Sequence, residues 1–293
     1  MSRTSARALV AAVAATALAA TAACSASAPS DDASAAQAPD ATARSMLMPV
    51  GAGHVHAVAK DPASGRLLLA THAGLFAEGK EEFERVGPAI DLMGFTVAGP
   101  NHYYASGHPQ PGSDLPNPVG LIESRDGGQT WQVLSRGGTS DFHAMAAAGS
   151  GIAGFDGTLR FTEDGKAWDD LPSGFEPISI TGRVDDRRLV ASTNEAVMTS
   201  GDSGRTWASV PDSPAPALVS RADNAVIALT ADGRVHLADA SGRAWMQTEL
   251  TAKAPQALLA SGSTAQLEII VLTEDGLMVS RNGRAFVPWT PQG

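Results

Sequence analysis

The sequence predicts an all-β protein folded as a six-bladed β-propeller, and two observations support this prediction. A short polar segment that ends in an aromatic residue recurs six times, with the aromatic positions 48, 37, 39, 38 and 41 residues apart. A repeat near 40 residues is typical of propeller blades. Each repeat also contains short runs of β-forming residues bounded by Gly, Asp, Asn or Pro, without helical spacing of apolar residues. The aromatic positions are Phe83, Trp131, Trp168, Trp207, Trp245 and Phe286.

The first 23 residues have the pattern of a lipoprotein signal peptide. Arg3 and Arg7 precede an apolar run of about 16 residues, which matches a secretory signal and is short for a membrane span of roughly 20 residues. Cys24 ends this run and, as the chain's one cysteine, cannot form an internal disulfide. The segment resembles the lipobox of bacterial lipoproteins, which implies acylation of Cys24 and extracytoplasmic attachment to the cell membrane. Thr21 replaces the usual Leu, so the alternative is ordinary cleavage of the signal peptide and secretion of the protein.

Residues 24–49 are expected to form a disordered tether. Their composition of Ala, Ser, Pro and Asp lacks apolar periodicity and cannot bury enough surface to offset the entropy of ordering. The propeller is therefore expected to occupy residues 50–293. Residues 50–53 or the tail PWTPQG could close the ring by exchanging a strand, and the sequence leaves this open.

The repeated segment is expected to be a structural turn between the third and fourth strands of a blade. Its clearest copies are SRDGGQTW and SGDSGRTW, and TEDGKAW is a shorter copy. Asp accepts backbone hydrogen bonds in such a turn, Gly adopts positive φ, and the aromatic residue packs between blades. The residues assigned to this role are Ser124, Asp126, Gly128, Trp131, Asp164, Trp168, Ser200, Asp202, Gly204 and Trp207.

These segments resemble the Asp-box, or BNR, repeats of sialidases and other secreted propellers. The chain is also similar to a family of actinobacterial lipoproteins described as glycosyl-hydrolase-like. The resemblance covers about residues 50–290 and includes HVHAVAKDP, ATHAGLF, DLMGFTV, ASGHPQPGSDLPNPVGLIESRDGGQTW and DFHAM in that order. It implies a sialidase-like fold and suggests glycoside hydrolysis.

The usual sialidase chemistry does not carry over to this chain. That mechanism needs an arginine triad and a late tyrosine nucleophile paired with Glu, whereas the two tyrosines here are Tyr103 and Tyr104, and the Arg-Ile-Pro motif is missing. A glycoside hydrolase with non-standard catalytic residues remains the alternative function. Its catalytic residues are unknown from the sequence, which does not decide whether the protein is an enzyme.

Five histidines are expected to converge on the face opposite the repeated turns. In a propeller, the inner strand begins at the same end of the blade as the turn between its second and third strands, and side chains alternate along a strand. Neutral imidazole binds zinc or copper, and Asp can complete or orient such a site. Interblade hydrogen bonding is the alternative role. The candidate ligands are His54, His56, His72, His108, His143, Asp91 and Asp141.

The partners follow from this interpretation. A metal, a small ligand or a glycan is expected on the histidine face, and the membrane is contacted only through lipidated Cys24. The insertion HPQPGSDLPNP, residues 108–118, is expected to wall the site or to be a solvated loop. A net charge of −10 offers no electrostatic surface for nucleic acid. We expect a monomer.

Overall fold

The computed structural model describes residues 48–49 and 51–291, which form six four-stranded antiparallel sheets. This arrangement confirms the predicted all-β, six-bladed propeller. Helix in the described part of the chain is confined to one 3-10 turn, η1 (Thr264–Gln266). The predicted signal peptide, Cys24 and residues 24–47 of the tether lie outside the described residues.

The strands of each blade are consecutive in the sequence and occur in the same order in space. The first three blades contain β1 (Val55–Lys60), β2 (Leu67–Thr71), β3 (Gly74–Glu78), β4 (Phe83–Val86); β5 (Ile90–Gly99), β6 (His102–Pro109), β7 (Leu121–Ser124), β8 (Gln132–Ser135); and β9 (Ala144–Ala148), β10 (Gly151–Phe155), β11 (Leu159–Thr162), β12 (Asp169–Asp170). The last three contain β13 (Ser179–Gly182), β14 (Leu189–Ser192), β15 (Val197–Ser200), β16 (Ala208–Ser209); β17 (Pro216–Arg221), β18 (Ala225–Thr230), β19 (Arg234–Asp239), β20 (Met246–Thr251); and β21 (Ala257–Ser261), β22 (Glu268–Thr273), β23 (Gly276–Ser280), β24 (Val287–Pro288).

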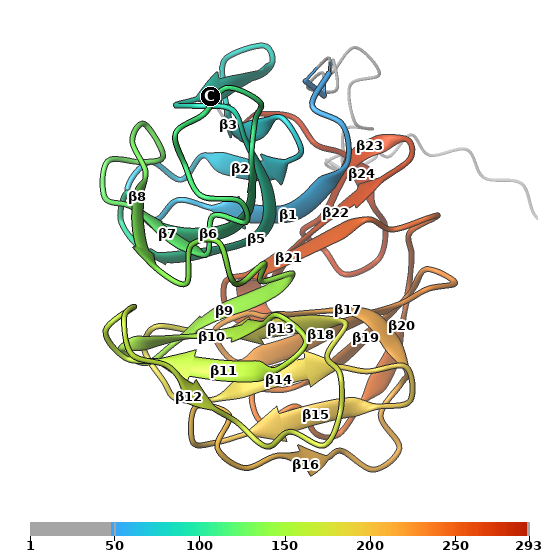
Figure 1. Ribbon diagram of the computed structural model, residues 1–293. Coiled ribbons are helices and arrows are strands. Elements are labelled where there is room, and N and C mark those ends of the chain that lie inside the picture. The colour runs from blue at the N-terminus through green and yellow to red at the C-terminus, as the bar shows by residue number, and fades with distance from the viewer. Residues whose placement is uncertain (1–47, 50, 292–293) are drawn as a thin grey trace, which may run out of the picture. The chain divides into compact units, whose positions relative to one another are not determined.

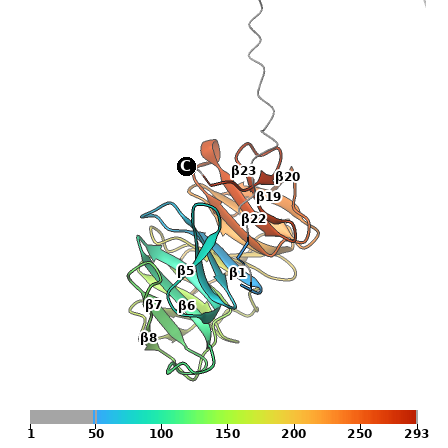
Figure 2. The same ribbon diagram turned by 90° about the horizontal axis from the view of Figure 1, so that it is seen from above.

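The first strand of each blade packs against the first strands of its two neighbours, and β21 packs against β1 to complete the ring. Figure 1 shows the last blade beside β1, and Figure 2 shows the first blade between the second and the last. Every sheet in the described part of the chain uses four consecutive strands. The ring therefore closes there by side-chain packing, without the strand exchange that the sequence left open.

The core consists of six hydrophobic clusters, one at each junction between neighbouring blades. Each cluster holds one of the periodic aromatic residues. Phe83 lies at the junction of the last and first blades, Trp131 at the next, and the series continues around the ring with Trp168, Trp207, Trp245 and Phe286. The repeat in the sequence is thus a repeat of blade contacts, because each aromatic side chain buries its area against the preceding blade.

The repeated turns connect the third and fourth strands, as predicted. Ser124 Oγ accepts from Gly128 N at 2.8 Å, and Ser200 Oγ accepts from Gly204 N at 2.9 Å. The Oδ1 atoms of Asp126 and Asp202 each accept a backbone hydrogen bond at 2.9 Å from the Thr four residues later. Gly128 has φ of 92°, and a Cβ there would lie 2.3 Å from Leu75 Cδ2 on the neighbouring blade. Glycine is required by both the turn and the packing.

Candidate metal centre

The seven candidate ligands occupy equivalent places in the first three blades. Inner strands begin, and second strands end, at the same edge of each antiparallel sheet: Val55 pairs with Thr71, and Asp91 pairs with His108. The repeated turns follow the third strands at the opposite edge. The residues at the first edge are His54, His56, His72, Asp91, His108, Asp141 and His143.

Three of the histidines form a compact group that we call the first histidine cluster. His54, His56 and His72 each offer a ring nitrogen, and these nitrogens lie within 4.8 Å of one another. The His56 ring centroid lies 4.9 Å from that of His54 and 4.6 Å from that of His72. His56 Nε2 is buried and has no hydrogen-bond partner. This nitrogen is therefore free to bind a metal ion or a hydrogen-bond donor that the described residues do not supply.

The cluster favours neutral imidazole. Burial, with a further contribution from the adjacent rings of His54 and His72, lowers the pKa of His56 to about 4, because a charged ring would lose its hydration and be repelled by charge on its neighbours. The ring of His56 is therefore neutral near pH 7. A neutral imidazole offers a nitrogen lone pair, which is the form that binds a transition metal.

Asp91 orients the third ring of the cluster. His72 Nδ1 lies 2.9 Å from Asp91 Oδ1, so Nδ1–H donates to the carboxylate and Nε2 is left as the ligand nitrogen. Metal-binding histidines commonly make this contact to a carboxylate or carbonyl oxygen. Asp91 thus acts on the cluster through His72, as an orienting residue.

The remaining candidates form a second group around Asp141. His108 Nε2 lies 3.0 Å from Asp141 Oδ2, and His143 Nε2 lies 3.4 Å from the same oxygen. His108 Nδ1 also contacts Asn117 Oδ1 at 2.8 Å. The Asn117 contact and the Asp141 carboxylate raise the pKa of His108, although partial burial opposes them. Asp141 Oδ1 is buried without a hydrogen-bond partner.

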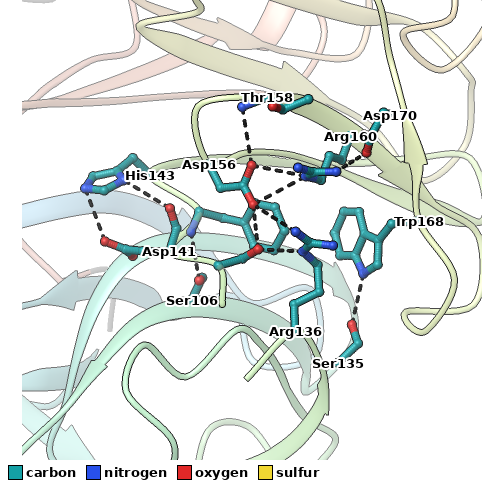
Figure 3. Close-up of polar contacts among 12 residues, drawn as sticks. Ser106, Ser135, Arg136, Asp141, His143, Asp156, Thr158, Arg160, Trp168 and Asp170 are labelled. Carbon is teal, nitrogen blue, oxygen red and sulfur yellow. Dashed lines mark hydrogen bonds and ion pairs between the residues drawn. The ribbon is translucent and has the colours of Figure 1, made fainter. Parts of the chain in front are cut away.

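The loop that carries Asp141 and His143 is anchored at several points (Figure 3). Ser140 Oγ donates to Asp156 Oδ2, Phe142 N donates to Ser106 Oγ at 2.9 Å, and His143 N donates to the Phe155 carbonyl at 3.0 Å. These anchors come from β6 and from the end of β10. The loop is therefore held on both sides of Asp141, between the second and third blades.

The insertion of residues 108–118 contacts both groups. Gln110 Nε2 donates to the His72 carbonyl at 3.0 Å, while Asn117 contacts His108. Leu115 packs against the hydrophobic cluster between the first two blades. The insertion is thus attached to both groups through Gln110 and Asn117, while its residues 111–114 are exposed to solvent.

A central channel opens beside the two groups. Its volume is about 700 Å³, and residues of the first strands of all six blades line it. His56 and His143 belong to this lining at the edge where the inner strands begin, and Lys60 and Arg183 belong to it where those strands end. A small molecule in the channel can therefore reach His56 of the first histidine cluster and His143 of the second group.

The structure thus divides the predicted site into two groups and adds residues that the sequence analysis missed. Asn117 lay inside the recognised insertion, and its Asn-Pro position gave no signal of a contact to His108. Asp156 and Ser140 belong to no motif that the sequence reveals. The other two histidines lie elsewhere: His102 contacts Glu123, and His236 is on β19. The residues of the repeated turns are at the opposite edge, which supports their structural assignment.

Comparison with known proteins supports the fold. No protein-family model matches the chain, and no curated protein matches it. Among solved structures, an ancestral GH74 enzyme aligns with a TM-score of 0.55 and 13% identity, over 80% of this chain and 37% of that chain. The chain therefore spans only a little over a third of that enzyme.

Two further solved structures match over most of both chains. A chain of a nidogen/laminin complex has a TM-score of 0.58 and 15% identity, over 74% of this chain and 89% of that chain. The WD40 domain of Neurospora crassa Pan2 has a TM-score of 0.53 and 14% identity, over 83% and 81%. At these identities the similarity establishes the propeller fold alone. Within the described residues, no helix has the length and apolar character of a membrane span.

Proposed function

We propose that this protein is an extracytoplasmic metal-binding propeller that holds one zinc or copper ion at the first histidine cluster. His54, His56 and His72 are the proposed ligands, and Asp91 orients His72. The observation that carries this proposal is the approach of three ring nitrogens to within 4.8 Å, with His56 Nε2 buried and unpartnered. Leaving such a buried nitrogen without a partner costs about 1–3 kcal/mol, which a bound metal ion would recover.

The donor set favours zinc or copper over calcium or magnesium. Imidazole is a borderline ligand that suits zinc and copper, whereas calcium and magnesium prefer oxygen. Three protein ligands also leave a coordination position for water or for a small ligand in the adjacent channel. A glycan or another small ligand on the same face is compatible with such a site.

The alternative of a glycoside hydrolase has less support. The two carboxylates beside the histidines, Asp91 and Asp141, both contact imidazoles. The GH74 similarity is limited to the fold. We therefore retain metal binding as the proposed function.

The remaining sequence-based expectations complete the proposal. The repeated turns are proposed to be Asp boxes, supported by the same hydrogen-bond pattern at Asp126 and Asp202. Acylated Cys24 is proposed to attach the chain to the outer side of the cell membrane, with release by cleavage as the alternative. The protein is proposed to act as a monomer.

Metal analysis tests the proposed site. The full-length chain, purified without a polyhistidine tag, is dialysed separately against Zn²⁺ and Cu²⁺, and the bound metal is measured by elemental mass spectrometry. We expect the variant His54→Ala/His56→Ala to bind one equivalent less than the wild type. His236→Gln on β19 is the control and should bind as the wild type does. A folded wild type that binds neither metal would contradict the proposal.

A further inference from the structure

We infer that the central channel takes a medium-chain carboxylate, whose carboxylate group binds the metal ion at the first histidine cluster and whose hydrocarbon chain lies along the channel. This inference rests on the proposed function, because the metal ion anchors the carboxylate. It goes beyond that function by naming the class of ligand. The apolar wall of the channel, the location of its charged residues and its length support it.

The channel wall contains large apolar side chains that the protein leaves partly exposed. Met93, Leu218 and Leu258 line the channel from three different blades and are only partly buried. Ile178, also in the lining, is 46% exposed and is one of four exposed large hydrophobic residues in the described part of the chain. Such side chains gain free energy when an apolar ligand displaces water from them. The wall therefore favours a ligand with a hydrocarbon body.

The channel is uncharged, histidines aside, at the end where the first histidine cluster lies. Ile178 directly precedes β13 just as His143 directly precedes β9, so both residues lie at the end where the inner strands begin. The charged residues among the described lining residues all lie where the inner strands end: Lys60, Asp61, Arg183, Arg221 and Asp223. The metal ion would therefore be the main charge at its own end of the channel.

The cations at the far end already have partners within the protein. Lys60 pairs with Glu268 at 2.8 Å. Arg183 pairs with Asp223 at 2.9 Å, and Arg221 is also paired with a carboxylate. A second anionic group on the ligand would compete with these carboxylates. The ligand is therefore expected to be charged at one end only.

The metal end favours an anionic donor. Imidazole is a neutral ligand, so an ion held by His54, His56 and His72 keeps its full divalent charge. Such an ion favours an anionic oxygen in the coordination position that three protein ligands leave open. His56 belongs both to the cluster and to the channel lining, so a carboxylate on this ion would have its chain beside the apolar wall.

The length of the channel limits the length of the chain. His56 and Lys60 are four residues apart on β1, which corresponds to about 13 Å at the usual rise of a strand. An extended chain of about eight carbons fits this distance, because C–C bonds of about 1.5 Å advance the chain by about 1.3 Å each. The channel volume of about 700 Å³ also lies in the range of small-molecule sites.

Calorimetry with carboxylates of increasing length tests this inference. The full-length chain is loaded with Zn²⁺, or with Cu²⁺ if only copper binds, and is titrated with acetate, butyrate, hexanoate and octanoate. We expect binding to tighten about threefold or more for each added methylene group, because each group buries apolar area. The metal content of every sample is measured by elemental mass spectrometry before the titration.

Variants of the channel wall locate the chain. Leu218→Gln and Ile178→Gln should weaken octanoate binding about tenfold, because each places a polar group against the hydrocarbon, while acetate binding and metal content stay unchanged. Met246→Gln, at a 62% exposed position on β20, is the matched control. His54→Ala/His56→Ala should lose the metal and octanoate together. Thermal melting checks folding, and the exposed Ile178→Gln keeps the test valid if Leu218→Gln does not fold.

The outcomes separate this inference from the proposed function. A metal-loaded wild type that does not bind octanoate, or binds it no more tightly than acetate, overturns the channel ligand and leaves the metal site. Octanoate binding that both channel variants leave unchanged overturns it too, because the chain would then lie elsewhere. Octanoate that binds equally well without metal overturns the anchored carboxylate. A folded wild type that binds neither metal overturns the proposed function and this inference together.

Discussion

At the residue scale, Asp156 links blade stability to the geometry of the candidate site. Its carboxylate, only 7% exposed, accepts from Ser140 Oγ at 2.5 Å and from Arg160 Nε at 3.1 Å, and it also contacts Arg136. Burial tends to raise the pKa of Asp156, but the hydrogen bonds from Ser140 and Arg160 outweigh burial and lower it. The ionised form therefore stabilises the folded state.

We predict that Asp156→Asn destabilises the protein by about 3 kcal/mol, because it removes the charge from a buried ion pair and leaves Arg160 without this carboxylate. The folded-state pKa lies below the ordinary value of 3.8, so this contribution is present above pH 3.8 and is lost as the pH falls through the folded-state pKa. Urea denaturation between pH 3 and 7 measures it. The variant should show a weaker acid dependence than the wild type, and exposed Asp169→Asn is the control. Equal acid dependence in Asp156→Asn and the wild type would refute the assignment.

At the element scale, neighbouring inner strands approach closely at a glycine. A Cβ at Gly94 on β5 would lie 2.2 Å from the Phe142 carbonyl oxygen, which precedes β9, and 2.8 Å from Met145 Sδ. The first contact involves backbone, which a rotamer change cannot relieve. The close packing of β5 against the start of β9 therefore depends on the missing side chain.

We predict that Gly94→Ala destabilises the propeller by about 1–3 kcal/mol through overpacking. Chemical denaturation measures the effect. Gly201→Ala is the matched control, since a Cβ there meets no atom within 4 Å. Similar losses in both glycine variants would contradict the steric explanation.

At the scale of the whole molecule, the ring is closed by contacts between the last and first blades. Trp289 is 3% exposed and packs in the same cluster as Phe83 and Val279, and its Nε1 donates to Glu78 Oε1 at 3.3 Å. Lys60 and Glu268 add an ion pair at 2.8 Å across this junction. With no exchanged strand among the described residues, these side chains carry the closure.

We predict that Trp289→Ala costs about 3–5 kcal/mol, the usual cost of emptying a large aromatic site. Hydrogen exchange should accelerate first in the first and last blades, because their shared junction is weakened while the other five junctions remain intact. Val287→Ala, at a 43% exposed position two residues earlier, is the control. Uniform acceleration around the ring would indicate that closure does not depend on this junction.

The candidate site was only partly predictable from the sequence. Strand alternation and blade topology predicted that His54, His56 and His72 lie at one edge of their blade. The same topology predicted that Asp91 and Asp141 would lie nearby. It did not separate the two groups, because that division depends on the side-chain contacts of His72 with Asp91 and of His108 with Asp141.

The sequence by itself determined the fold class, the six blades and the role of the repeated turns. It could do so because each blade junction contains one large aromatic side chain, so these aromatic residues recur at a regular spacing along the chain. Only the tertiary structure decided how the ring closes and which imidazoles meet, with the Asn117 contact and the Asp156 anchor as further examples. These contacts join residues from different strands and loops, and their geometry depends on the relative placement of whole blades, which no local pattern encodes.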